Sequence, residues 1–193
     1  AKTLCPTDNV RSRTVLLLDV SDPLTPRQQA ALDNLLRDLR DPATSEGNMV
    51  AAGLPGGSRY VEPYAQLVAY SLAKEGSPLK HFLRICNPGN PDEMTFKSEL
   101  TASKKRVAAR WKNFEKLIKE NFEQATSSTG IPNSPILESL GVIIQNEASS
   151  VPLRVSGGDI PLRVIIFSDM VQNSKTLSHF KSIPDPIKYH IDS

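Results

Sequence analysis

Short apolar runs alternate along this chain with longer segments whose apolar residues recur at a helical period. The runs are residues 15–20 (VLLLDV), 66–73 (QLVAYSLA), 81–86 (HFLRIC) and 162–170 (LRVIIFSDM). Continuous apolar runs of this length are typical of strands that are buried on both faces of a sheet. The pattern therefore predicts four strands.

The first expected helix follows the first strand directly. Thr25 is a good N-cap, Pro26 suits the first helical position, and Gln28 completes a capping box. Apolar residues then repeat on one face of the segment until Asp41-Pro42 ends it.

Two more helices are expected in the second half of the chain. Residues 102–126 form the longest helical pattern, with apolar side chains recurring every three or four positions: Val107, Trp111, Phe114, Ile118 and Phe122. Another helix is expected to start at Ser134-Pro135 and continue through residues 136–145. Strands that alternate with helices predict an α/β fold with a mostly parallel sheet, and 193 residues suit a single domain, 1–193.

Composition and net charge limit the classes of partner that are expected for this chain. Hydrophobic residues make up 39% of the chain, charged residues 23%, and the net charge is +2, as in ordinary globular proteins. A charge this small disfavours nucleic acid as a partner. No apolar run approaches the ~20 residues needed to span a bilayer. A membrane contact is therefore expected only through a segment upstream of Ala1.

The polar face of the 102–126 helix is basic, and it includes Lys104, Lys105 and Lys112. One interpretation is a solvated surface on a helix that packs its other face into the core. The other is a basic strip that binds an acidic protein partner, an acidic polymer or lipid headgroups.

Polar side chains gather where the first and last strands end. Asp19, Ser21 and Asp22 follow the first run, and Ser168 and Asp169 follow the last. In open parallel sheets, ligands bind outside the carboxyl ends of the strands. These residues are therefore candidates for a binding site, although each could also cap a turn or a helix.

Three of these segments together resemble the von Willebrand factor type A domain. They are DVSDP (19–23), NSPILESL (133–140) and VIIFSDM (164–170), and the resemblance covers residues 14–170. It implies a three-layer, doubly wound α/β fold of the Rossmann type, with a mostly parallel sheet and helices on both faces. After Asp169 the sequence shows no clear strand-helix-strand ending, so the C-terminal part is expected to be shortened or to have an unusual sheet edge.

The resemblance also implies a metal-ion-dependent adhesion site, in which Mg²⁺ bridges the domain to an acidic group of a partner. Carried over by position, its ligands are Asp19, Ser21, Ser134 and Asp169. Pro23 stands where the family has a third oxygen ligand, and the neighbouring Asp22 is expected to contact the partner. We therefore expect a degenerate site with weak or absent Mg²⁺ binding, no organic cofactor, and a protein partner.

Enzyme activity is the alternative to a binding role. Asp19, Asp22 and Asp169 around Mg²⁺ would suit phosphoryl transfer or hydrolysis. The three histidines have no zinc-ligand spacing, however, and no nucleophile elbow is present. The sequence therefore favours a non-catalytic interaction or scaffold domain.

The two cysteines, Cys5 and Cys86, are relevant to the cellular compartment in which the protein is expected. They are either two free thiols or one long-range disulfide. The LCP before the first strand and the CNPG turn after the third resemble bacterial envelope proteins with an N-terminal membrane segment. This resemblance implies an extracytoplasmic or periplasmic, membrane-tethered domain. Because Cys5 precedes the first strand and Cys86 ends the third, both cysteines are expected near the same region of the sheet. A reduced pair would favour the cytoplasm.

Overall fold

The structure is a computed structural model of residues 1–193. Its main feature is a mixed sheet with helices packed against it. The described residues are 5, 10, 12–45, 59–73, 77–89, 100–127, 133–149, 154–155, 158–159, 161–171, 173–174 and 178. The expected unusual C-terminal edge falls mainly on residues 179–193, which lie outside the described residues.

Within the described residues the main sheet has four strands in the order β3-β2-β1-β6. Their bounds are Arg13–Leu18 (β1), Gln66–Ser71 (β2), His81–Cys86 (β3) and Leu162–Phe167 (β6). β1 pairs in parallel with both β2 and β6, whereas β3 runs antiparallel to β2. The prediction of a mostly parallel sheet is confirmed.

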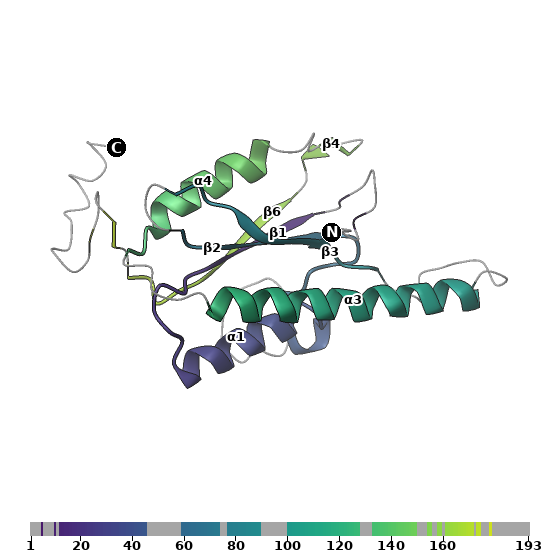
Figure 1. Ribbon diagram of the computed structural model, residues 1–193. Coiled ribbons are helices and arrows are strands. Elements are labelled where there is room, and N and C mark those ends of the chain that lie inside the picture. Colours follow the sequence, from purple (N-terminus) through teal and green to yellow (C-terminus); the bar gives the residue numbers. More distant parts are fainter. Residues whose placement is uncertain are drawn as a thin grey trace.

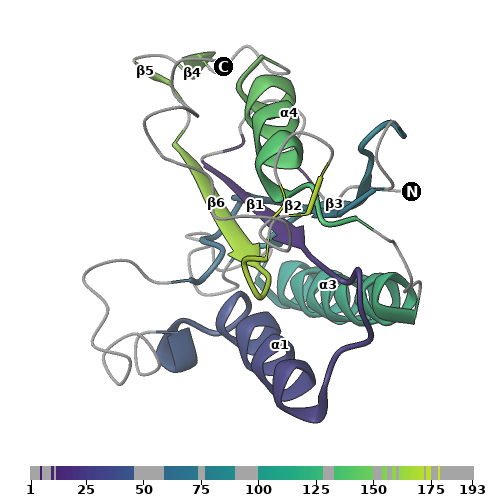
Figure 2. The ribbon, with the colours of Figure 1, turned by 90° about the vertical axis from the view of Figure 1, so that its left-hand side faces the viewer.

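Three long helices cover the sheet: α1 (Pro26–Asp38), α3 (Leu100–Ser127) and α4 (Ile136–Ser149). Figure 1 shows α4 above the sheet and both α1 and α3 below it. In Figure 2, a quarter turn away, the same division holds and β6 lies beside β1. A two-stranded ribbon, β4 (Arg154–Val155) with β5 (Gly158–Asp159), was not predicted from the sequence.

The alternation of side chains along β1 explains this layering. Leu16 and Leu18 point to one face, where they join the apolar faces of α1 and α3 in one core. Val15 and Leu17 point to the other face and pack with Ile143 of α4 in a second core. A strand buried on both faces must be apolar at consecutive positions, which is why it appears as an uninterrupted run.

The start of α1 matches its prediction. Thr25 is the N-cap, its hydroxyl accepts from the backbone N–H of Gln28, and the Gln28 side chain accepts from the backbone N–H of Thr25. This reciprocal pair begins the helix at Pro26, eight residues after β1 ends, and leaves the intervening turn available for other contacts.

Strand boundaries differ from the expected ones at polar residues. β1 begins at Arg13 and ends at Leu18, two residues earlier at each end than the apolar run. Arg13 is buried inside the strand because Glu147 of α4 compensates its charge. β2 similarly ends at Ser71, before the last apolar residues of its run.

A tight turn follows β3 and anchors α3. Gly89 has a φ of 89°, and a Cβ there would lie 2.4 Å from the ring of Tyr64, so only glycine fits. Its carbonyl accepts a 2.9 Å hydrogen bond from Nε1 of Trp111. The aromatic face of α3 is thus held against the end of β3.

Candidate functional site

Asp19 lies at the carboxyl end of β1 and is only 8% exposed. Its backbone N–H donates to the carbonyl of Phe167, the last residue of β6, at 2.9 Å. The parallel pairing of β1 with β6 therefore places the residues after both strands at one edge of the sheet. This is the edge at which the sequence predicts a site.

Three hydroxyl groups converge on the carboxylate of Asp19. Ser21 donates to Oδ1 through its backbone N–H (3.1 Å) and its hydroxyl (2.8 Å). Ser134 and Ser168 each donate a hydroxyl to Oδ2, at 2.7 and 2.9 Å. Both carboxylate oxygens thus accept two hydrogen bonds, and three separate segments meet at this side chain.

A short bridge between two loops positions Ser134. Its backbone N–H donates to the carbonyl of Asn173 (2.8 Å), and Asn173 returns a hydrogen bond to the carbonyl of Ser134 (2.9 Å). Ser178 in turn donates its hydroxyl to the side chain of Asn173. The segment that precedes α4 is therefore fixed to the segment that follows β6.

Asp169 makes a different contact from the one expected of a metal ligand. The residue is exposed, and Oδ1 accepts from the backbone N–H of Val171 at 2.9 Å. Met170 has a φ of 63°, and its N–H donates to the hydroxyl of Ser168. Asp169 caps this turn, and its neighbour Ser168 makes the contact with Asp19.

The remaining residues of the first segment face solvent. Asp22 and Pro23 are both exposed, whereas Ser21 is partly buried. Of the four predicted ligands, the structure brings together Asp19, Ser21 and Ser134 and adds Ser168. The sequence places Ser168 at a strand end, but nothing in the pattern distinguishes it from Asp169.

The donor set fits a tightly held Mg²⁺ poorly. Mg²⁺ prefers six oxygen ligands that include one or two carboxylates. Both carboxylate oxygens of Asp19 already accept hydrogen bonds, Asp169 accepts from the backbone N–H of Val171, and Pro23 has no side-chain oxygen. In the part of the chain that the structure describes, no three residues of the Asp, Glu, His and Cys types form a group that could hold a metal ion.

The basic strip lies on α3. Lys105 and Lys112 are exposed, and the side chain of Lys104 lies outside the described residues. Further along the helix, Lys116 and Lys119 pair with glutamates four positions later, at 3.7 and 3.8 Å. The cationic character of the helix is therefore strongest in its first half.

A second polar cluster, around Glu147 of α4, was missed by the sequence analysis. Glu147 is 1% exposed, and Oε1 accepts from Nη2 of Arg84 (2.5 Å) and from the hydroxyl of Tyr70. Nη1 of Arg13 lies 2.8 Å from Oε2 and donates to the Glu147 carbonyl. Two guanidinium groups thus compensate one buried carboxylate, and Arg13, Tyr70 and Arg84 connect α4 to β1, β2 and β3.

This environment affects the ionisation of Tyr70. Burial, followed by the hydrogen bond to Glu147, raises the pKa of Tyr70 to about 12. The phenol therefore stays protonated throughout the ordinary pH range and acts as a hydrogen-bond donor. The sequence signal for the cluster is a glutamate on the apolar side of α4, at a position where the helical period calls for a core residue.

Cys5 and Cys86 form a disulfide, with their Cα atoms 4.7 Å apart. The expectation that these residues lie near each other is confirmed. Gln66 donates to Sγ of Cys5 (3.5 Å), and its Oε1 accepts from Arg13 and Arg84. The disulfide therefore adjoins the Glu147 cluster.

Comparison with protein-family models, curated proteins and solved structures finds no match for this chain. Among the helices in the described ranges, none is long and apolar enough to cross a membrane.

Proposed function

We propose that this chain is a non-catalytic protein-interaction domain of the von Willebrand factor type A kind, with a degenerate adhesion site at Asp19. The observation that carries the proposal is the convergence of the Ser21, Ser134 and Ser168 hydroxyls on the Asp19 carboxylate. Two of these serines occupy positions that the family resemblance assigns to the adhesion site.

The order of the strands supports the same family. Doubly wound sheets have the spatial order 3-2-1-4, with the chain reversing direction across the sheet beside the first strand. Here β3, β2, β1 and then β6 follow that order, and the antiparallel β3 is at the edge, where such sheets often carry one reversed strand. Asp19 lies at the carboxyl end of the central strand, beside this reversal.

The partner is a protein that contacts the Asp19 edge, where Asp22 is exposed. Mg²⁺ binding at this edge is weak or absent, since internal hydrogen bonds already satisfy the carboxylate of Asp19. The exposed Lys105 and Lys112 form a separate basic strip that suits an acidic surface of a partner.

The enzyme alternative receives less support. A phosphoryl-transfer site would need Asp19, Asp22 and Asp169 to face one metal ion. Asp19 instead accepts four hydrogen bonds from protein groups, and Asp169 caps the turn after β6.

The disulfide supports an extracytoplasmic location, because such bonds persist in oxidising compartments. We propose a periplasmic or extracellular domain that is tethered through a segment upstream of Ala1. Cytoplasmic location is the alternative, and the redox state of Cys5 and Cys86 in cells distinguishes the two.

Site-specific photo-crosslinking tests the interaction role. A photoreactive residue replaces Asp22, at the proposed binding edge, or Glu62, an exposed control that precedes β2 at the opposite edge. A discrete adduct from position 22 alone, lost on Ser134→Ala, supports the proposal. Equal adducts from both positions contradict it, and Mg²⁺-dependent phosphatase activity that disappears in Asp19→Asn favours the enzyme.

A further inference from the structure

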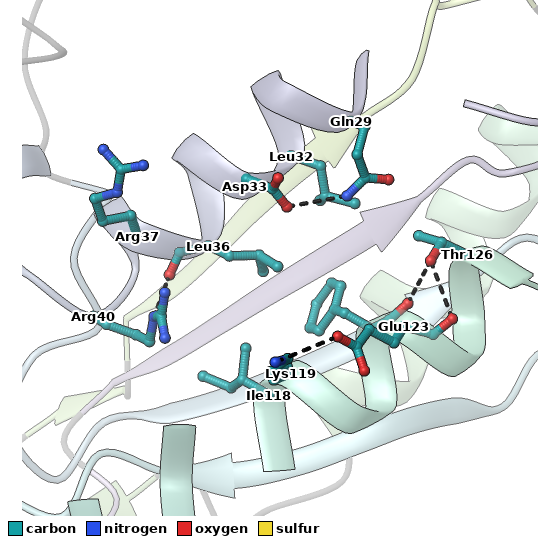
Figure 3. A pocket seen from close by; sticks show the side chains of 11 residues that line it. Gln29, Leu32, Asp33, Leu36, Arg37, Arg40, Ile118, Lys119, Glu123 and Thr126 are labelled. Carbon is teal, nitrogen blue, oxygen red and sulfur yellow. Dashed lines mark hydrogen bonds and ion pairs between the residues drawn. The ribbon is translucent and has the colours of Figure 1, made fainter. Parts of the chain in front are cut away.

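A cleft lies between α1 and α3, on the face of the sheet away from α4 (Figure 3). Its volume is about 430 Å³, which falls within the range of small-molecule sites. It is lined by residues of the two helices and by Arg40, in the turn that follows α1, and it shares no residue with the Asp19 cluster. Nothing in the proposed function accounts for it.

The floor of the cleft is apolar. Leu32 and Leu36 of α1 face Ile118 and Phe122 of α3, and all four belong to the core cluster on this face. Figure 3 shows Leu32, Leu36 and Ile118 between the two helices. Leu36 is 9% exposed and the other three are 1–2% exposed, so the cleft offers narrow carbon edges against which a small apolar body can lie.

The two ends of the cleft differ in charge. Arg37 and Arg40 lie at one end, whereas the neutral Gln29 and Thr126 lie at the other (Figure 3). Nε of Arg40 donates to the carbonyl of Leu36 at 2.8 Å, which orients its guanidinium beside the apolar floor. The remaining N–H groups of a guanidinium held in this way can receive an acidic group.

The acidic residues of the cleft already have partners. Asp33 accepts from the side-chain amide of Gln29 at 3.0 Å, and Glu123 pairs with Lys119 at 3.8 Å. Two arginines and one lysine face one aspartate and one glutamate, so the lining carries an excess positive charge at the Arg37 end.

We propose that this cleft binds a small amphipathic anion. The apolar body of the ligand lies on Leu36, Ile118 and Phe122, and its acidic group binds Arg40, with Arg37 at the outer rim. The inference does not depend on the function proposed for the Asp19 edge.

A pair of fluorescent probes tests the inference. 8-Anilinonaphthalene-1-sulfonate has an apolar body and a sulfonate, and N-phenyl-1-naphthylamine has nearly the same body without the charge. Both are titrated against the wild type, Arg37→Gln/Arg40→Gln, and Arg27→Gln, an exposed arginine on the same helix outside the cleft. Thr126→Trp narrows the cleft from its neutral end.

The double variant is expected to weaken sulfonate-probe binding about tenfold and to change neutral-probe binding less than about twofold. Arg27→Gln should leave both unchanged, Thr126→Trp should weaken both, and decanoate should displace the sulfonate probe better than decanol does. Unchanged sulfonate-probe binding in the double variant, or no binding by the wild type, would overturn the proposal. Binding that survives Thr126→Trp places the probe elsewhere and also overturns it.

Discussion

The hydroxyl of Ser134 donates a 2.7 Å hydrogen bond to the carboxylate of Asp19, a residue 115 positions earlier in the chain. Ser134 and Asp19 are 7% and 8% exposed, so water cannot easily replace the lost donor. Ser134→Ala is therefore expected to lower the free energy of unfolding by about 1–3 kcal/mol. Urea denaturation measures the change. Ser127→Ala, an exposed serine at the end of α3, is the control, and equal effects of the two variants would contradict the assignment.

Pro23→Ser restores an oxygen at the position where the resemblance implies a third ligand. If the Asp19 cluster is a decayed adhesion site, this variant should bind Mg²⁺ and Mn²⁺ more tightly than the wild type. Isothermal titration calorimetry measures the binding. Pro26→Ser adds a hydroxyl at the first position of α1 and should have no effect. If neither the wild type nor either variant shows a heat of metal binding, the Asp19 turn is only a connection that leads into α1.

The basic half of α3 offers a charge-reversal test. Lys105→Glu/Lys112→Glu should elute from a heparin column at lower salt than the wild type, because electrostatic binding to acidic polymers is salt-dependent. The thermal midpoint should not change, since both side chains are exposed. Lys116→Glu/Lys119→Glu is the control, because each of these lysines already has a glutamate partner. Equal shifts for the two variants would contradict a localised strip.

Tyr70 makes stability depend on pH at the alkaline end. Its pKa is raised to about 12 in the folded protein, so the folded state holds the phenolic proton more tightly than the unfolded state does. The resulting stabilisation is complete below about pH 10 and is lost as the pH rises toward about 12. Urea midpoints at about pH 9 and about pH 11 should fall less in Tyr70→Phe than in the wild type. The same fall in both would show that Tyr70 does not ionise in this way.

The disulfide closes a loop of 81 residues between Cys5 and Cys86. Cys5→Ser/Cys86→Ser should therefore lower the free energy of unfolding by about 2–5 kcal/mol. Reduction of the wild type should produce a similar loss, which separates the effect of the bond from that of the serines. A loss below about 1 kcal/mol in both experiments would mean that the bond constrains the unfolded chain little.

Much of the fold follows from apolar periodicity. The strands and the capped start of α1 are evident because strand and helix periods differ and because Thr25 and Gln28 form a local pair. Polar residues that are buried against partners far away in the sequence cannot be predicted from periodicity. Arg13 begins β1 only because Glu147, 134 positions later, compensates it, and no local pattern contains that pairing.

The candidate site, too, could be predicted from the sequence only in part. Asp19 and Ser21 could be proposed as site residues because they follow the carboxyl end of a buried strand. Ser134 precedes a helix, and only the family resemblance implied its place in the site. The resemblance indicated Asp169, but Ser168 donates to Asp19, and Asp169 accepts from the backbone N–H of Val171. Which of these adjacent side chains reaches Asp19 depends on the conformation of the turn after β6, and the apolar pattern does not contain this information.

The pairing of β1 with β6 has a consequence for biosynthesis. Thr14 and its register partner Arg163 are 149 positions apart, so one edge of the central strand stays unpaired until β6 has been made. At the usual pace of translation this interval lasts roughly 10–30 s. During this interval the unpaired edge of an apolar strand can pair with another chain. The Asp19 site, which needs residues from both strand ends, is therefore completed late in the synthesis of the domain.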